Sequence, residues 1–88
     1  MDSTRELLQS QYDQELLFAD GFDEAIIGVS ANVGIARVVY CVDKMLDILM
    51  EEGEEYLSAR EYLEYNTLNA WVGKRTPIYV ESMKCFMD

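Results

Sequence analysis

Glycine-containing breaks divide this chain into short hydrophobic segments, and this division limits what the chain can fold into. Gly21, Gly34, Gly53 and Gly73 each separate stretches of different hydrophobic periodicity. Glycine is common in turns and just after helix ends because it has no Cβ to hinder left-handed backbone conformations. No stretch approaches the roughly 20 apolar residues of a membrane-spanning helix. We therefore expect a single domain, residues 1–88, built from short helices and strands.

Two helices are predicted on either side of the central apolar segments. Ser3-Thr4-Arg5-Glu6 fits a capping box, so the first helix starts there and ends before the turn signal Asp20-Gly21. The second helix covers Lys44 to about Glu52, with Asp43 at the N-cap and Gly53 just after the last turn. Its inward-facing stripe comprises Val42, Met45, Leu46 and Leu49.

A third helix is predicted from about Tyr56 to Trp71, and Gly73 is expected to end it. Its larger aromatic residues are expected in the core or at its rim: Tyr62, Tyr65 and Trp71. This helix nevertheless has more apolar surface than one face can bury. The alternative candidates for an exposed contact are Tyr56, Tyr65 and Asn66.

The remaining apolar segments are predicted to be strands because they are short and rich in β-branched residues. Residues 25–29 and 37–41 form a hairpin, and Gly28 indicates a bulge or a close helix contact. Residues 76–81 form a last strand, in which Pro77 favours an edge position. The order α-β-β-α-α-β does not strictly alternate. We therefore expect an α+β fold, a small three-stranded antiparallel sheet with about three helices packed on it.

Acidic residues dominate the charge of the chain. There are 17 Asp and Glu against 7 Lys and Arg, which gives a net charge of −10 at pH 7. Half of the residues are hydrophobic, which indicates a folded acidic domain rather than a disordered acidic tail. This charge disfavours direct binding to nucleic acid or to a membrane, because both are negatively charged. We expect a protein partner that is basic or that handles nucleic acid.

Residue types that serve catalysis or metal binding are scarce. The chain has no histidine, the commonest acid–base residue at neutral pH. Glycine-rich phosphate loops and Ser-His-Asp patterns are also absent from the sequence. Cys41 and Cys85 are too few for a metal site and are expected to be reduced thiols. We therefore expect no enzymatic activity, no cofactor and no metal.

The acidic residues form two clusters, residues 13–24 and residues 47–64. Each cluster has two interpretations, a solvated face or a recognition surface for a basic partner. Mimicry of nucleic acid is a variant of the second, since seven acids on one continuous helix over 47–64 would approach the charge spacing of a single strand. Gly53 interrupts such a helix. The residues expected to contact the partner are Asp47, Glu51, Glu54, Glu55, Glu61 and Glu64.

Two stretches of the chain resemble a family of small phage and prophage proteins. They are Asp20-Gly-Phe-Asp-Glu-Ala-Ile-Ile-Gly-Val29 and the segment 61–80, with Asn-Ala-Trp-Val-Gly73 followed by Thr76-Pro-Ile. Asn69 stands where the family pattern has glycine, and Ser58 stands where it tends to be acidic. The resemblance implies a viral origin and a place of action in the cytoplasm of the infected host. It supplies no catalytic residues.

The resemblance suggests a function by analogy with small acidic phage proteins that disable host machinery, including restriction and CRISPR systems. On that hypothesis the protein is an anti-defence or host-takeover inhibitor that acts by protein–protein contact. The alternative is a structural or accessory module that binds another phage protein or forms a homodimer through the edge strand at residues 77–80.

Overall fold

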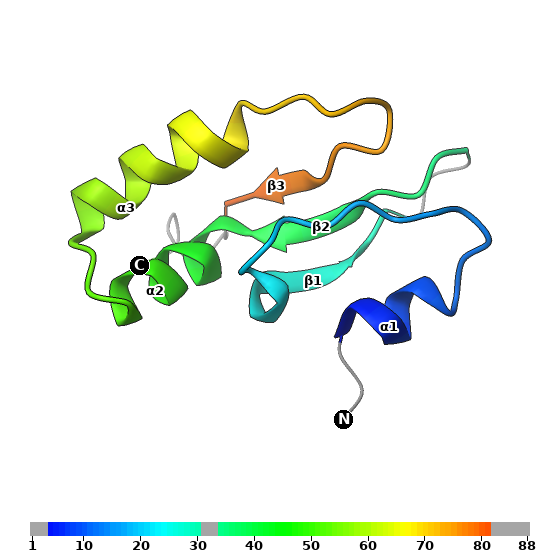
Figure 1. The fold of residues 1–88 in the computed structure, drawn as a ribbon, viewed down its shortest axis with the longest axis horizontal. Helices are drawn as coiled ribbons and strands as arrows, with labels where there is room; N and C mark the ends of the chain where they lie inside the picture. The colour runs from blue at the N-terminus through cyan, green and yellow to red at the C-terminus, as the bar shows by residue number, and fades with distance from the viewer. Residues whose placement is uncertain (1–3, 31–33, 82–88) are drawn as a thin grey trace.

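The computed structural model describes residues 4–30 and 34–81. The helices and strands are α1 (Thr4–Gln9), β1 (Ile26–Val29), β2 (Val38–Cys41), α2 (Val42–Glu51), α3 (Tyr56–Leu63) and β3 (Ile78–Val80). A 3-10 turn, η1 (Asp23–Ala25), precedes β1, and a π-helical segment, η2 (Glu64–Leu68), continues α3 (Figure 1). The predicted order α-β-β-α-α-β and the α+β class are confirmed. The predicted cap at Ser3, most of the hairpin loop and Cys85 lie outside the described residues.

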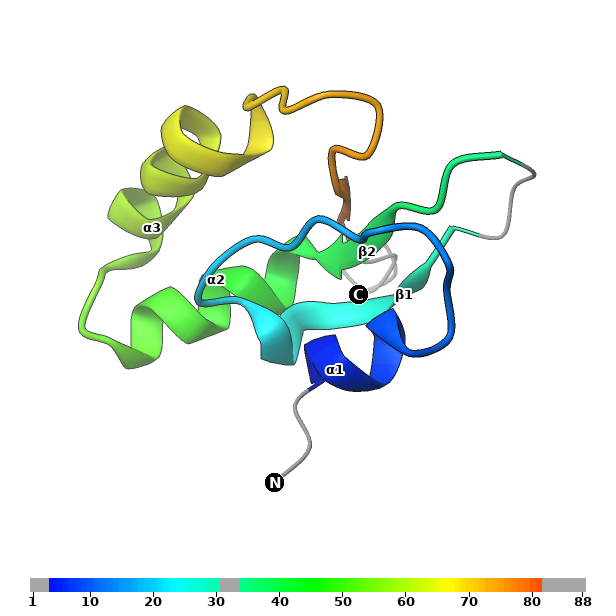
Figure 2. The ribbon, with the colours of Figure 1, turned by 45° about the vertical axis from the view of Figure 1, so that its right-hand side comes forward.

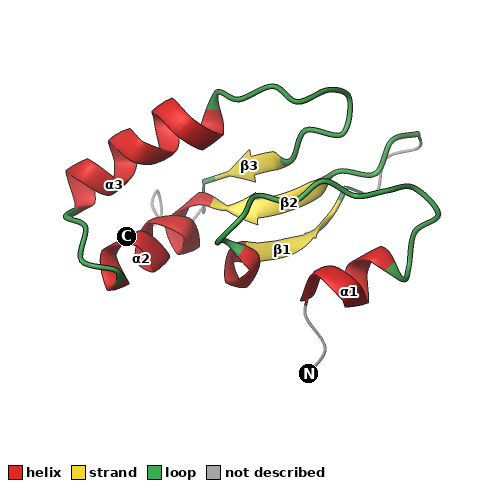
Figure 3. Ribbon diagram, viewed as in Figure 1, coloured by secondary structure: helices red, strands yellow, loops and turns green. Residues whose placement is uncertain are grey.

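The three strands form one sheet in the order β1-β2-β3 (Figure 3). β1 and β2 pair antiparallel, as the predicted hairpin requires, and their register shifts between Ile26 and Gly28. This shift in register confirms the irregularity predicted at Gly28, where a bulge was one of the two explanations. Among the described residues, no atom comes within 4 Å of where a Cβ on Gly28 would lie, so a close helix contact does not explain the glycine.

β3 runs parallel to β2, so the prediction of an all-antiparallel sheet was wrong. Figures 1 and 2 show the reason: α2 continues beyond the end of β2, α3 returns beside it, and residues 69–77 carry the chain back to the start of β2. Two helical passes therefore make the long crossover that parallel strands need. β3 lies at an edge of the sheet, as Pro77 predicted.

Helix α1 ends at Gln9, well before the turn signal Asp20-Gly21 that set the latest predicted end of the helix. The side-chain amide of Gln9 donates to the carbonyl of Gln14 at 2.7 Å, and its oxygen accepts from the N–H of Leu16 at 2.8 Å. The Ser10 hydroxyl also donates a hydrogen bond to the Leu7 carbonyl at 2.7 Å. Such a local side-chain bond competes with the backbone hydrogen bonds that would continue the helix. Leu16 is therefore buried although it lies in an irregular segment and not on the face of a helix.

Helix α2 begins at Val42, and its N-cap residue is Cys41. Asp43, the predicted N-cap, lies instead in the first turn of the helix. The strand leads directly into the helix without a connecting loop, and Cys41 supplies no side-chain cap. An acid in the first turn still favours the helix through its dipole. The predicted inward stripe is confirmed, because α2 buries Val42, Met45, Leu46 and Leu49.

Gly53 has the role predicted for it at the end of α2. Its φ is 107°, and its N–H donates to the carbonyl of Met50 at 3.1 Å. The N–H of Glu54 reaches the carbonyl of Leu49 at 3.2 Å, which completes a Schellman motif. This motif reverses the chain, so that α3 packs beside α2.

Helical structure after Tyr56 ends at Leu68, before the predicted end at about Trp71. Gly73 instead opens a turn, in which the Thr76 N–H donates to its carbonyl at 3.1 Å. Ala59 and Leu63, one helical turn apart, are the residues that this helix buries. The predicted core positions were wrong for three residues, because they lie outside this narrow buried face: Tyr62, Tyr65 and Trp71.

The core forms one cluster around Tyr40 of β2, whose side chain is fully buried. The Tyr40 hydroxyl accepts a hydrogen bond from the Ala19 N–H at 2.7 Å, and its ring lies 5.6 Å from that of Tyr79. Burial raises the pKa of Tyr40. In the part of the chain that is described, no helix has the length and apolar character to cross a membrane.

Candidate protein-binding surface

The two acidic clusters of the sequence meet where η1 packs against α2. Glu24 of η1 and Glu51 of α2 line the same two hollows beside Ile48, with volumes of about 410 and 180 Å³. Ala25, the last residue of η1, is fully buried, which anchors this turn to the core. Glu24 belongs to the predicted cluster 13–24 but was not among the six predicted contact residues, because nothing in its local sequence indicates that η1 packs on α2.

Two arginines are held by carboxylates of their own chain. Hydrogen bonds to Asp23 and to Glu81 raise the pKa of Arg5 and of Arg60, respectively. Because each arginine binds two acids, neither is available to neutralise other acids nearby. The four ion pairs span 2.7–3.1 Å and join Arg5 to Asp20 and Asp23, and Arg60 to Glu64 and Glu81.

The other two arginines bind backbone carbonyls. Arg37 Nε donates to the Thr76 carbonyl at 2.6 Å, which ties β2 to the segment before β3. Arg75 Nη1 donates to the Glu15 carbonyl at 2.9 Å, which ties the segment before β3 to the N-terminal segment. All four arginines of the chain therefore hold its segments together.

Seven exposed carboxylates around α2 consequently make no ion pair within the described residues. They occupy η1, the outer side of α2, the turn after it, and the outer side of α3. Lys44 lines the smaller hollow together with Glu24, Asp47 and Glu51, but it makes no ion pair within the described residues. We call this group the acidic surface: Glu24, Asp47, Glu51, Glu52, Glu54, Glu55 and Glu61.

The six predicted contact residues are all exposed, but they do not form one line. Because the chain reverses at Gly53, they are distributed over a helical hairpin, and the continuous helix assumed for nucleic-acid mimicry does not exist. Glu64 also differs from the others, since Arg60 binds it at 3.0 Å. The remaining five belong to the acidic surface: Asp47, Glu51, Glu54, Glu55 and Glu61.

Large apolar side chains are exposed along α3, in η2 and in the residues that follow it. Tyr65 is 83% exposed and Trp71 is 71% exposed, although both are the kind of side chain that usually forms a core. The exposure considered as an alternative for Tyr56, Tyr65 and Asn66 is confirmed. We call the apolar residues of this region the aromatic strip: Tyr56, Leu57, Tyr62, Tyr65, Trp71 and Val72.

A groove of about 480 Å³ separates α3 and η2 from the irregular segment 17–22. Tyr62 of α3 and Asp20 of the irregular segment are among the residues that line it. Phe22 and Tyr79 also contribute to the lining, and burial raises the pKa of Tyr79. Within the described residues, neither the Tyr62 nor the Tyr79 hydroxyl makes a hydrogen bond.

Residues 4–30 and 34–81 contain no group of three His, Cys, Asp or Glu residues that could hold a metal ion. Cys41 is a buried free thiol at the end of β2. Comparison with protein-family models, with curated proteins and with solved structures gave no match to this chain. The resemblance to small phage proteins thus stands on the sequence motifs alone.

Proposed function

We propose that this protein is a non-catalytic binding module that acts on a basic protein through direct contact. The observation that carries the proposal is the acidic surface, whose seven carboxylates have no basic partner in the described part of the chain. Like charges at this density repel one another and raise the local negative potential. A partner with lysines and arginines would relieve the repulsion and would be attracted at long range.

The aromatic strip favours recognition over a merely solvated face. A surface that serves only to interact with water does not need exposed Tyr65 and Trp71. Protein interfaces, in contrast, are enriched in tyrosine and tryptophan at their centres and carry polar groups at their rims. An aromatic centre beside the acidic surface fits that arrangement.

We extend the proposal to the biological setting through the resemblance at residues 20–80. A small viral protein of this kind would act inside an infected bacterium and bind a component of host machinery. Host proteins that handle nucleic acid present the basic surfaces that the acidic surface would recognise. Inhibition would then follow from occupying the surface that such a protein uses for nucleic acid.

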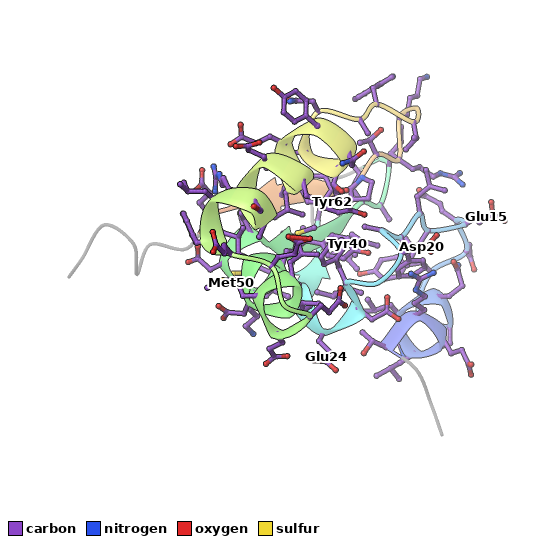
Figure 4. All side chains as sticks on the ribbon, turned by 60° about the vertical axis from the view of Figure 1, so that its left-hand side comes forward. Glu15, Asp20, Glu24, Tyr40, Met50 and Tyr62 are labelled. Atoms are coloured by element: carbon purple, nitrogen blue, oxygen red, sulfur yellow. The ribbon has the colours of Figure 1, made fainter. Side chains whose placement is uncertain are left out.

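Capture from a bacterial lysate with two charge-matched variants tests this proposal. Glu51→Lys/Glu54→Lys changes the acidic surface, whereas Asp13→Lys/Glu15→Lys makes the same charge change elsewhere. Figure 4 shows Glu15 on the opposite side of the molecule from Met50 of α2. We expect the wild type and the second variant to retain a basic protein at low salt, identified by mass spectrometry and released by high salt. The first variant should lose it.

Circular dichroism spectra of both variants establish that each is folded. Retention of the same partner by Glu51→Lys/Glu54→Lys, with an unchanged spectrum, would contradict the proposal. Equal loss of the partner by both variants would mean that binding depends on the net charge of the protein and that the acidic surface has no special role.

A second candidate function is a module that self-associates. It is favoured by β3, which pairs only on its β2 side within the described residues and so leaves an edge for another strand. Light scattering distinguishes the two candidates. A dimer mass that does not change with salt would favour self-association, because backbone pairing and apolar contact are little screened.

A further inference from the structure

We propose that the groove between α3–η2 and residues 17–22 receives an apolar side chain of the partner, with a neighbouring lysine or arginine of the partner at Asp20. This inference rests on the proposed function and assigns it an anchor point. The groove volume of about 480 Å³ lies within the range of sites that bind small groups, about 300–1,000 Å³. The partner segment that fits is therefore amphipathic, with apolar and cationic side chains together.

The lining of the groove is suited to an apolar group. Leu17, Phe22 and Pro77 contribute apolar surface, and Tyr62 and Tyr79 add aromatic faces. The two tyrosine hydroxyls, unbonded within the described residues, can serve polar atoms of the partner backbone. Tyrosine combines these two properties with little loss of side-chain entropy.

The edge of the groove already holds a cation from this chain, which indicates the charge it prefers. Arg5 lies 5.1 Å from the centre of the Phe18 ring and donates to Asp20 Oδ1 at 3.1 Å. The Asp20 side chain remains 96% exposed, so it can accept a second cationic group. An aromatic face with a carboxylate beside it is a favourable site for a guanidinium or an ammonium.

The groove is continuous with the surface proposed for the partner. Tyr62 and Val72 belong both to the aromatic strip and to the groove lining. At the other end of the groove, Gly21 of the segment 17–22 also lines the hollow that contains Glu24 and Glu51. A partner segment seated in the groove would thus lie beside Asp20 and extend past Gly21 toward Glu24 and Glu51, which is why a basic partner is the occupant that the charges favour.

Three synthetic 12-residue peptides without tryptophan test the proposal. The first has leucines and lysines spaced to give one apolar helical face, the second has serine for leucine, and the third has glutamate for lysine. Fluorescence of Trp71, the one tryptophan of the chain, reports binding because its neighbours Ala70 and Val72 line the groove. We expect the Leu/Lys peptide to bind about 10- to 100-fold more tightly than either of the others.

Two variants add the same side chain at different places. Ala70→Phe fills the groove from its lining, whereas Ser58→Phe adds a phenylalanine at an exposed position of α3 outside the lining. We expect Ala70→Phe to weaken the Leu/Lys peptide about 10- to 100-fold and Ser58→Phe to leave it unchanged. Asp20→Asn should weaken binding by about two- to fivefold at low salt.

The results separate the two proposals. Equal affinity of the Leu/Lys and Ser/Lys peptides, or equal effects of Ala70→Phe and Ser58→Phe, would overturn the groove proposal and leave the acidic surface as the binding site. The peptide comparison decides even where a variant does not fold. If no lysine peptide binds at low salt, both proposals are overturned. If the wild type is a dimer and Ala70→Phe dissociates it, a second copy of the chain occupies the groove. That result would also overturn the groove proposal.

Discussion

Two regions of the molecule are stabilised in opposite ways. They are the N-terminal segment, residues 4–25, and the helical hairpin, residues 42–68. The N-terminal segment has little regular structure, yet side-chain bonds from Arg5, Gln9 and Gln14 fasten it to itself and to the residues just before β2. The helical hairpin satisfies its own backbone through regular structure and buries one narrow stripe. Its outer side is left to water, with exposed acids and aromatic rings.

This contrast teaches that an irregular segment is not a loosely held one here. Functional residues are often found on loops that a rigid scaffold positions. In this protein the irregular segment is the part held by specific side chains, and the regular hairpin carries the residues that are free to contact a partner. Substitutions of the side chains that fasten the first region, such as Gln14, should therefore disturb folding, whereas substitutions on the outer side of the second should affect the proposed binding and leave the fold intact.

The largest expected effect concerns the two faces of α3. Leu63→Ala should lower the free energy of unfolding by about 2–5 kcal/mol, because Leu63 is fully buried and its removal leaves a cavity. Leu57→Ala should change it by less than about 0.5 kcal/mol, since Leu57 is 73% exposed. Urea unfolding followed by circular dichroism measures both. Similar losses would mean that the outer side of α3 is covered after all.

A smaller effect is expected in the N-terminal segment. The Gln14 side chain accepts from the Ala36 N–H at 2.9 Å and donates to the Gly34 carbonyl at 2.8 Å. Gln14→Ala should lower the free energy of unfolding by about 1–2 kcal/mol. Gln11→Ala is the matched control, because the Gln11 side chain is exposed and makes no hydrogen bond within the described residues. If the two variants unfold at the same urea concentration, the segment is not held in this way.

The smallest effect at neutral pH is expected at the junction of the two regions. Tyr40→Phe removes the acceptor of the Ala19 N–H and should lower the free energy of unfolding by about 1 kcal/mol. It should also change the response to alkali. Burial raises the pKa of Tyr40, so the stability that the neutral phenol contributes is complete below the unfolded pKa of about 10 and is lost as pH rises through the folded value.

Unfolding measured at about pH 8 and about pH 11 checks the alkaline part of this prediction. Wild type should lose more stability between the two than Tyr40→Phe, whose remaining loss comes in part from Tyr79, the pKa of which burial also raises. An identical loss in the two proteins would show that Tyr40 does not titrate differently in the folded and unfolded states.

Local signals in the sequence predicted the elements that depend on local interactions. The Schellman end of α2 follows from Gly53, the β1 bulge follows from Gly28, and the buried stripe of α2 follows from its periodicity. The direction of β3 was not predictable in this way. It depends on how far the segment 69–77 carries the chain after η2, which no local pattern encodes.

The candidate surface was predictable only in part, for the same reason. Exposure of acids such as Glu51 and Glu54 follows from their charge, and the structure agrees. The meeting of Glu24 with Glu51 arises from packing between η1 and α2. The groove likewise requires residues from three separate segments, 17–22, 62–72 and 76–79, so a reading of any one of them could not reveal it.

The parallel pairing of β3 has a consequence for how the chain folds. The strands of the β1–β2 hairpin are close in sequence, whereas Val39 of β2 pairs with Ile78 of β3, which follows two helices later in the chain. Contacts between residues so distant in sequence are slow to form, because the intervening chain must first be ordered. We expect β3 to dock last. Tyr79 reaches the groove only at that step, so a nascent or partly folded chain would be unable to engage a partner there prematurely.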